Sequence, residues 1–367
     1  MASSYDGIQY GSRVDTTTER KLHAKVVDQI LSAPTYFSRI LGQGKPFLGK
    51  TEDITVDIVS DTQGEFFIGL ETLNSAAVST TITLSYAHTA FTQPKVSIML
   101  ESFANMGQAG TISLDAFKYA KAAAETLQRF GTAIYADGTA NRPNGLGLLV
   151  DDTGTVGGQS RSTYSALNAV DTASGGTLTL TKMATLYDAI SISGLSSTEP
   201  NVGLTTKTVW SLYEQLLSPN VRVSYSEAGY PAVPVRGKYA VKNKAELKNA
   251  QGFTALSYRG IPVMKDDFAT SGYLFFLNES SYNWMGRVGV PEEYSGKVKK
   301  VSLGTNKAYE GAGAEAMDLP SEYNGFFYQD SMMLPNQAGT IARFYVIGQV
   351  VGKSFRDLGR LTGITGV

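Results

Sequence analysis

The 367-residue sequence contains no cysteine and only two histidines, His23 and His88. Without cysteine the chain can form no disulfide, thiolate nucleophile or cysteine-ligated zinc site. Two histidines are too few for a three-histidine metal site. Charge is scarce as well: 18% of the residues are charged and the net charge is −1, which argues against a protein that binds nucleic acid through a broad basic face.

Long apolar runs are also missing. The longest are a handful of residues, such as 261–264, whereas a membrane helix needs about 20. The sequence starts with a polar stretch that lacks the apolar region of a signal peptide, so we expect no membrane association. The lack of cysteine fits a protein that is made and kept in a reducing cytoplasm, or one that never needed disulfides.

Glycine and apolar residues, by contrast, are plentiful. Glycine occupies 38 of the 367 positions, and an apolar content of 42% is enough for a folded core. The length suits two or three domains, or one elaborate domain.

Residues 1–48 are expected to form an arm rather than a domain, because they hold too few apolar residues to bury a core alone. Leu22, Val26 and Ile30 share one helical stripe, which Pro34 should end. A glycine-rich linker then leads into the next segment.

Residues 49–100 change to the two-residue period of strands. Alternating apolar residues predict strands at 53–60 and 80–92, and the extended pattern continues through EFFIGLETL at 65–73. Asn74-Ser75-Ala76 supplies turn residues, so we predict one long antiparallel hairpin. Because a two-stranded hairpin is marginal in water and a long edge invites pairing, it should lie on a neighbouring subunit.

Residues 113–137 carry the clearest helix signal. Apolar and small residues recur every three or four positions from Phe117 to Ile134. Ser113 is a suitable N-cap, and Asp137-Gly138 should end the helix. At 1.5 Å per residue, this is a rod of about 36 Å.

The rest of the chain mixes short helices and strands. A glycine-rich loop at 139–178 precedes two amphipathic helices, one at 183–190 with Thr181 as its cap and one at 205–218 that ends before Pro219. Strands are expected within 260–266, 273–284 and 340–358. Because helices and strands do not alternate regularly, the expected fold class is α+β rather than a doubly wound sheet.

The chemical motifs in the sequence are weak. GQVVGKS at 348–354 is too short for a phosphate loop, which needs GxxxxGK[ST], and it lies in a strand-like run. GAGAEA at 311–316 spells GxGxxA but lacks the flanking strand and helix of a dinucleotide site. Neither histidine belongs to a recognisable catalytic or metal motif.

The charged clusters favour solvated surfaces. Adjacent carboxylates on a strand point to opposite faces, so Asp151-Asp152, Asp266-Asp267 and Glu292-Glu293 are expected to be solvated loop residues. Two lysine clusters could make at most weak, non-specific contact with nucleic acid. They comprise Lys238, Lys242 and Lys244, and Lys297, Lys299 and Lys300. We therefore predict no catalytic, cofactor-binding or metal-binding residues, and no enzyme.

Several segments, in their order and spacing, resemble those of a known fold. ETLN at 71–74 is similar to the tip of an extended hairpin loop, and 200–217 is similar to a short strand leading into a helix. Segments 258–268 and 273–284 resemble the paired strands of an axial domain, and 345–364 resembles a closing strand and tail that return to a peripheral domain. Together they resemble the major capsid protein of tailed bacteriophages, the Hong Kong 97-like fold, over nearly the whole chain.

The resemblance implies four parts. These are an N-terminal arm at 1–48, an extended hairpin loop at 49–100, a peripheral domain with a long spine helix at 101–144 and 336–367, and an axial domain at 145–335. Glycine tolerates varied backbone angles, so five glycines are candidate hinges for the arm and hairpin. They are Gly42, Gly44, Gly49, Gly64 and Gly69.

Two departures from the family pattern stand out. The closing segment reads Lys353-Ser354-Phe355-Arg356 where relatives often turn through an Asn-Pro-Arg-like sequence. The arm lacks the long charged helical prodomain of members that carry an internal scaffold. This difference indicates either a separate scaffolding protein or a mature, cleaved chain.

By resemblance, the protein is a structural subunit that assembles with itself, as pentamers and hexamers, into an icosahedral head shell around phage DNA. The implied partners are scaffolding, portal and decoration proteins, with weak non-specific contact to packaged DNA. The implied location is the virion, after assembly in the host cytoplasm. Two alternatives stay open: a non-viral cargo-enclosing nanocompartment of the same fold, and another phage structural protein such as a tail component.

Overall fold

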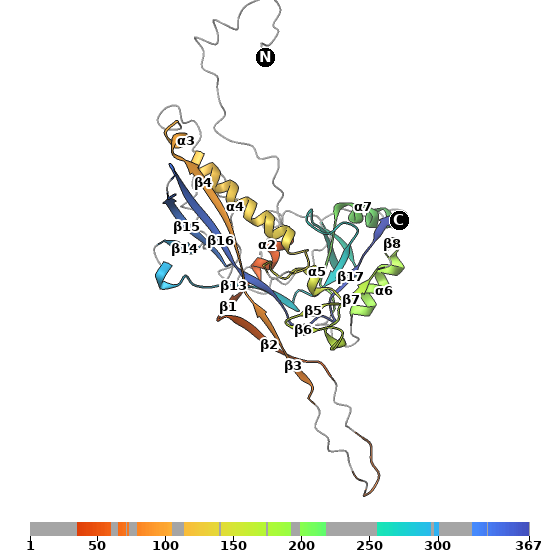
Figure 1. The fold of residues 1–367 in the computed structure, drawn as a ribbon. Coiled ribbons are helices and arrows are strands. Elements are labelled where there is room, and N and C mark those ends of the chain that lie inside the picture. Colours follow the sequence, from red (N-terminus) through yellow and green to blue (C-terminus); the bar gives the residue numbers. More distant parts are fainter. Residues whose placement is uncertain are drawn as a thin grey trace, which may run out of the picture.

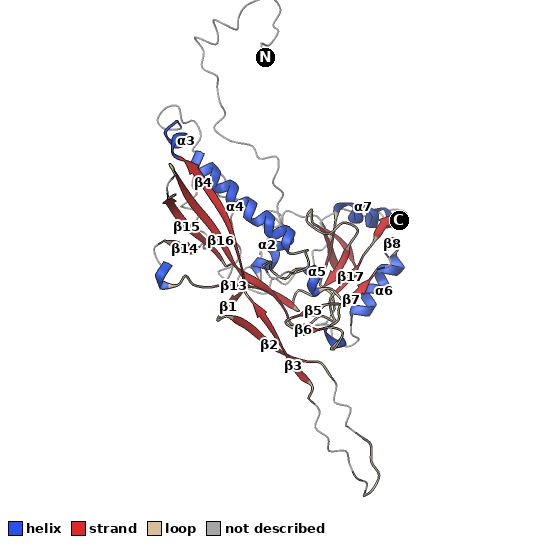
Figure 2. Ribbon diagram, viewed as in Figure 1, coloured by secondary structure: helices blue, strands red, loops and turns tan. Residues whose placement is uncertain are grey.

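The structure is a computed structural model in which two six-stranded sheets carry helices on their faces (Figure 1 and Figure 2). It describes residues 35–59, 65–70, 72, 79–104, 114–138, 141–173, 175–191, 199–217, 255–294, 297–300, 325–335 and 337–366. The mixture of helices with largely antiparallel sheets confirms the predicted α+β class.

The first sheet is antiparallel except at one edge. Its strands follow the order β1, β13, β16, β15, β14, and β4 also pairs with β16. Only β1 runs parallel to its neighbour, β13. The strands are β1 (Lys45–Phe47), β4 (Thr89–Ile98), β13 (Tyr282–Arg287), β14 (Val298–Lys300), β15 (Phe326–Met333) and β16 (Gly339–Gly352).

The long helix α4 (Leu114–Ala133) lies along one face of this sheet (Figure 2). Phe130 of α4 contacts the rings of Phe91 on β4 and Trp284 on β13, and Tyr119 contacts Phe344 on β16. The helix predicted at 113–137 is therefore present but shorter than expected, with 20 residues and a length of about 30 Å. Its predicted cap, Ser113, lies outside the described residues.

Helix α2 (Thr35–Gly42) corrects the prediction that residues 1–48 form an arm throughout. Tyr36, Phe37, Ile40 and Leu41 are all buried in the main core. The helix starts directly after Pro34, because proline is tolerated at the start of a helix as well as at its end. Residues 1–34, with the predicted stripe of Leu22, Val26 and Ile30, lie outside the described part of the chain.

A buried ion pair and a buried carboxylate hold α2 in place. Arg39 makes a two-pronged pair with Glu279, which lies between β12 and β13, and one of its two contacts measures 2.6 Å. The backbone N–H of Tyr36, in the first turn of α2, donates to the Asp266 carboxylate at 3.0 Å. Both acceptors come from segments far along the chain, so α2 joins distant parts of the sequence.

The second sheet has the strand order β10, β11, β9, β12, β17, β7. Its strands are β7 (Val170–Thr172), β9 (Val202–Thr205), β10 (Ala255–Tyr258), β11 (Ile261–Lys265), β12 (Leu274–Leu277) and β17 (Gly359–Leu361). Helices α6 (Leu180–Ile190) and α7 (Lys207–Leu217) pack their buried residues into its core. The strand–helix order of β9 and α7 agrees with the prediction for 200–217.

Smaller elements complete the described fold. They are α3 (Met99–Ala104), α5 (Leu146–Leu149), the 3-10 turns Ser165–Leu167 and Glu292–Tyr294, and two short pairs, β5 (Thr155–Val156) with β6 (Gln159–Ser160) and β8 (Gly176–Thr177) with β18 (Ile364–Gly366). None of the described helices, including the 20-residue α4, is both long enough and apolar enough to cross a membrane.

The hairpin is shorter than predicted. β2 (Thr51–Asp57) pairs with β3 (Thr81–Ala87), and together they project away from both sheets (Figure 1). Residues 89–98 do not continue it, because they form β4 and pair with β16 in the first sheet. Residues 65–70 belong to no strand, and the predicted turn at Asn74-Ser75-Ala76 lies outside the described residues.

The strand pairing also cuts across the predicted bounds of the peripheral and axial domains. β13, β14 and β15 fall in the segment 145–335 but pair within the first sheet, beside α4. β17 falls in 336–367 but pairs with β12 and β7 in the second sheet. The chain crosses between the two sheets after β4, after β12 and after β16, so each sheet is built from separated stretches of sequence.

Two local predictions need similar correction. The side chain that caps α6 is Thr179, which accepts from the backbone N–H of Lys182, whereas Thr181 is already inside the helix. The predicted pair of strands at 260–266 and 273–284 is not a direct pair. β9 lies between β11 and β12, and the end of the second segment forms β13 in the other sheet.

Candidate assembly surfaces

The base of the β2–β3 hairpin is fixed to the body of the protein on two sides. Ser85 of β3 donates its backbone N–H to the carbonyl of Gly157 at 2.9 Å. Tyr86 donates its hydroxyl to the carbonyl of Gly352, at the end of β16. Burial raises the pKa of Tyr86, so this hydroxyl keeps its proton as a donor. The hairpin therefore leaves the body in a fixed direction.

The loop that holds the hairpin is itself ordered by Arg161, whose side chain is completely buried. Its guanidinium donates four hydrogen bonds to backbone carbonyls, at distances from 2.8 to 3.2 Å. The acceptors are Leu148, Leu149, Thr153 and Leu167. Burial lowers the pKa of Arg161, while the Asp151 carboxylate raises it. The glycine-rich loop is thus built around one buried cation.

The far part of the hairpin exposes a row of large apolar side chains. Phe66, Ile68 and Leu70 are 107%, 90% and 107% exposed, whereas Phe67 between them is 57% exposed. The segment belongs to no strand and bends at Gly69, which has φ +88, so strand alternation does not apply to it. Three large apolar side chains within five residues are open to solvent, which is unusual unless another molecule covers them.

A second open surface is the face of the first sheet away from α4. On β16, partly exposed residues alternate with buried ones that pack toward the helix. The partly exposed set comprises Ile341, Arg343, Tyr345 and Ile347. The exposed residues of neighbouring β4 are Ala90, Thr92, Pro94, Val96 and Ile98. Only one of these nine side chains is charged, so this face is suited to contact with another protein surface.

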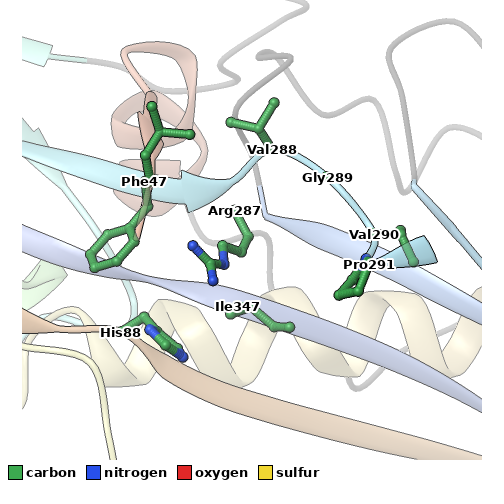
Figure 3. Close-up of a pocket in the computed structure, with 9 residues that line it drawn as sticks. Phe47, His88, Arg287, Val288, Gly289, Val290, Pro291 and Ile347 are labelled. Atoms are coloured by element: carbon green, nitrogen blue, oxygen red, sulfur yellow. The ribbon is translucent and has the colours of Figure 1, made fainter. Parts of the chain in front are cut away.

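One end of this surface holds a cavity of about 460 Å³ (Figure 3). Its walls are apolar apart from His88 and Arg287. The apolar lining consists of Phe47, Leu48, Val288, Gly289, Val290, Pro291 and Ile347. Arg287 also donates to the carbonyl of Gly49 at 2.7 Å, which ties the cavity to the start of the hairpin.

His88 is one of the residues that line this cavity. It is half-buried between β3 and β4, with its ring edge-on to Phe47 and Nδ1 3.3 Å from the carbonyl oxygen of Lys50. This agrees with the predicted partly exposed histidine. His23 lies outside the described residues.

Three carboxylates, Asp151, Asp152 and Asp171, come within 4.8 Å of one another. The Arg360 guanidinium lies 2.6 Å from an Asp171 oxygen and 3.4 Å from an Asp151 oxygen. This cation offsets the negative charge that would attract a metal ion, so the group is an ion-pair network and we assign no metal to it. Asp152 is exposed as predicted, whereas Asp151 is partly buried.

Asp266 was predicted to be solvated but is only 3% exposed. Its carboxylate accepts from the backbone N–H groups of Tyr36 and Phe268, both at 3.0 Å. Burial raises the pKa of this carboxyl, although these contacts favour its charged form. Asp267 pairs with Lys207 at 2.6 Å on the surface. Asp266 therefore accepts a hydrogen bond from the first turn of α2. The Asp266-Asp267 pair in the sequence did not indicate this role.

The other motifs that fall within the described residues lie in strands or on the surface. The glycines of GQVVGKS lie inside β16, as the strand interpretation predicted. Lys299 and Lys300 lie in β14, and Glu292 and Glu293 are exposed. Segment 311–316 and the lysines at 238–244 lie outside the described residues.

Comparison with known proteins identifies the fold. No family model and no curated protein matches the sequence. Among solved structures, the capsid asymmetric unit of cyanophage A-1(L) aligns with a TM-score of 0.64 and 15% identity, covering 95% of this chain and 97% of that one. The capsid of a native GTA particle aligns with a TM-score of 0.60 and 9% identity, covering 98% and 99% of the two chains.

A third match is the holo-SrpI encapsulin complex from Synechococcus elongatus PCC 7942, with a TM-score of 0.55, 11% identity and coverage of 95% and 94%. All three are shell structures rather than enzymes. The match spans both sheets and the helices between them rather than one shared motif. The protein therefore has the fold of the major capsid proteins of tailed phages, the Hong Kong 97-like fold.

Proposed function

We propose that the protein is the structural subunit of an icosahedral phage head shell, in which it assembles with copies of itself as pentamers and hexamers around DNA. The observation that carries this proposal is a capsid fold along 95% or more of the chain, combined with a projecting hairpin whose apolar side chains are exposed. No chemistry is needed for this function, because the protein acts through repeated contacts with its own copies.

In this proposal, the first sheet with α4 is the peripheral part of the subunit, and the second sheet with α6 and α7 is the axial part. The hairpin lies over an adjacent subunit. A stable protein contact usually buries about 800 Å² per partner. Each subunit of a shell makes several contacts, so modest individual affinities combine into a stable assembly.

The proposed partners are scaffolding, portal and decoration proteins, together with packaged DNA. Contact with DNA would be weak and non-specific, since the net charge of the chain is −1 and the described lysines are dispersed. The proposed location is the virion, after assembly in the host cytoplasm.

Negative-stain electron microscopy of the purified, full-length protein tests the proposal, with and without a candidate scaffold. We expect hollow shells, or rings of five and six subunits. A dispersed monomer under all these conditions would contradict self-assembly.

A cargo-enclosing nanocompartment is the second candidate, supported by the match to the encapsulin complex. The two functions differ in what the native particle contains. Nuclease-treated particles from the natural source should hold protected DNA if the protein is a phage capsid, and a protein cargo without protected DNA if it is a nanocompartment. A tail component would give tubes or fibres instead of closed shells.

A further inference from the structure

The floor of the cavity beside Arg287 is formed by three neighbouring strands of the first sheet. Arg287 on β13 is paired with Phe47 of β1. The preceding residue, Gly286, is paired with Gly348 of β16, which places Ile347 on the other side of Arg287. Directly opposed residues of adjacent strands project from the same face of a sheet. One cation therefore lies between two apolar side chains in a single row.

The residues that follow β13 add an apolar wall to this floor. Val288, Val290 and Pro291 line the cavity together with Leu48, which is 67% exposed, so the cavity is open to solvent. Figure 3 shows the Arg287 side chain in the middle of the residues that line the cavity. The volume of about 460 Å³ falls in the range of sites that enclose small organic molecules.

The charge of Arg287 is not neutralised inside the cavity. Of the described residues that line it, none is acidic, and the Arg287 guanidinium forms no ion pair with the described part of the chain. It donates one hydrogen bond there, to the carbonyl of Gly49 at 2.7 Å. Since a guanidinium has five N–H donors and binds a carboxylate through two parallel hydrogen bonds, Arg287 retains donors for an anionic group.

The floor favours an aliphatic chain over a peptide as the apolar part of an occupant. β13 is paired with β1 and β16, and β16 is paired with β4 on its other side, so the backbone groups of both strands are already used. A peptide brings an N–H and a carbonyl at each residue, and these groups cost free energy when they are buried without partners. An alkyl chain carries no such groups.

We propose that this cavity is a binding site for a medium-chain fatty carboxylate. The carboxylate accepts hydrogen bonds from the Arg287 guanidinium, and the alkyl chain packs against Phe47, Val290 and Ile347. All of these residues belong to one subunit, so the site goes beyond the proposed function and does not depend on self-assembly.

Isothermal titration calorimetry of the full-length protein at pH 7.5 tests the site with butanoate, hexanoate and octanoate. Each step adds two methylene groups to the buried chain, so we expect the affinity to rise about tenfold per step. Octanamide has the same chain without the charge and should bind at least about tenfold more weakly than octanoate. Octanoate should saturate the site with a Kd below about 1 mM.

Two variants with matched controls assign the binding to this cavity. Arg287→Met should weaken octanoate binding about tenfold and leave octanamide binding unchanged, because it removes only the cation. Ile347→Phe should weaken the binding of both ligands about tenfold by narrowing the cavity. Arg343→Met and Ile341→Phe are the controls, since both residues lie on the same face of β16 without lining the cavity, and both variants should bind as the wild type does.

Three results would overturn the proposal. Octanoate affinity that is unchanged in both Arg287→Met and Ile347→Phe would place the ligand elsewhere on the protein. Equal affinities for octanoate and octanamide would show that Arg287 does not recognise the carboxylate. Saturable binding of a blocked apolar tetrapeptide, without binding of octanoate, would make the cavity a peptide site. None of these measurements uses shell formation as its readout, so the proposed function is tested separately.

Discussion

At the scale of single residues, the buried side chain of Arg161 holds the glycine-rich loop together through hydrogen bonds to its backbone. Its four hydrogen bonds go to backbone carbonyls, and those to Leu149 and Leu167 are buried. Such acceptors each cost about 1–3 kcal/mol when they lose their partner. The loop that fixes the hairpin base therefore depends on this side chain.

Replacing Arg161 by methionine should lower the free energy of unfolding by about 3 kcal/mol, since the apolar side chain fills space but leaves these carbonyls unsatisfied. Urea unfolding followed by circular dichroism measures the change. Arg142→Met is the control, because Arg142 is exposed and should change stability by less than about 0.5 kcal/mol. Equal effects of the two substitutions would show that Arg161 does not organise the loop.

Lys353 is a second residue with a measurable consequence. Burial and the neighbouring Lys45 lower the pKa of Lys353 from 10.5 to about 8, although Glu52 acts in the opposite direction. In the unfolded chain, a lysine keeps its proton up to about pH 10.4. Between about pH 8 and 10, the unfolded state therefore binds more protons than the native state, and the free energy of unfolding rises with pH.

We expect Lys353→Met to remove this rise when unfolding is measured at several pH values across that window. Lys297→Met should retain it, because Lys297 is exposed. Tyrosines begin to titrate near the upper end of this pH window. Because they contribute equally to the free energy of unfolding of both variants, their contribution cancels when the two are compared. A rise of the same size in Lys353→Met would assign the pH dependence to other groups.

At the scale of elements, β3 packs closely against the glycine-rich loop at the base of the hairpin. Gly157 has φ +55, and an added Cβ would come within 2.7 Å of Leu84 Cβ and 3.1 Å of Leu84 Cα. Gly158 has a similar left-handed backbone, with φ +80, but its added Cβ would meet nothing within 4 Å. The two neighbouring glycines therefore separate backbone strain from close packing.

Gly157→Ala should lower the free energy of unfolding by about 1–3 kcal/mol more than Gly158→Ala, since only the first substitution pushes β3 away from the loop. Hydrogen exchange of the Ser85 amide, which bonds to Gly157, should accelerate only in Gly157→Ala. Equal destabilisation by both variants would mean that backbone conformation alone matters here.

The elements that could be predicted from the sequence are those whose pattern is local. The three- and four-residue spacing from Phe117 to Ile134 was enough to predict α4, and Val209 with Tyr213 was enough to predict α7. The missed helix α2 had a comparable signal in Tyr36, Phe37, Ile40 and Leu41, which the proline before it and the glycines after it obscured.

The errors arise where partners are distant in sequence. Alternation is unbroken from residue 80 to 92, so nothing local shows that the strand changes partner at His88. The hydroxyl of Thr89 donates to Gly348, 259 positions away. The same reason explains the domain bounds, because β13 and β17 are each assigned to a sheet by non-local pairing. The cavity beside Arg287 was missed as well, since its lining comes from four separate segments.

At the scale of the whole molecule, the low net charge of the chain is consistent with the proposed packing of many identical subunits. A subunit that packs against several copies of itself is favoured by weak like-charge repulsion, and a net charge of −1 provides this. The face of the first sheet that the described residues leave open is poor in charge, so this surface follows the same pattern as the composition.

Deleting residues 62–80 is the sharpest test of this view. The deletion leaves residues 58–61 to join β2 at Asp57 to β3 at Thr81, and a four-residue connection is a common hairpin loop. The anchoring contacts of Ser85 and Tyr86 with the body remain. We therefore expect a soluble, folded subunit with a nearly unchanged melting temperature that closes no shells in negative-stain images.

The triple substitution of Phe66, Ile68 and Leu70 by serine is the matched variant, because it keeps the length of the hairpin and removes only these exposed apolar side chains. If apolar contact drives assembly, this variant should fail to form shells as the deletion does. Each buried side chain of this size contributes about 1.5–3 kcal/mol, so three lost contacts would weaken the association of every copy by about 4.5–9 kcal/mol. Shells that form from the deletion variant would show that the hairpin does not hold neighbouring subunits together.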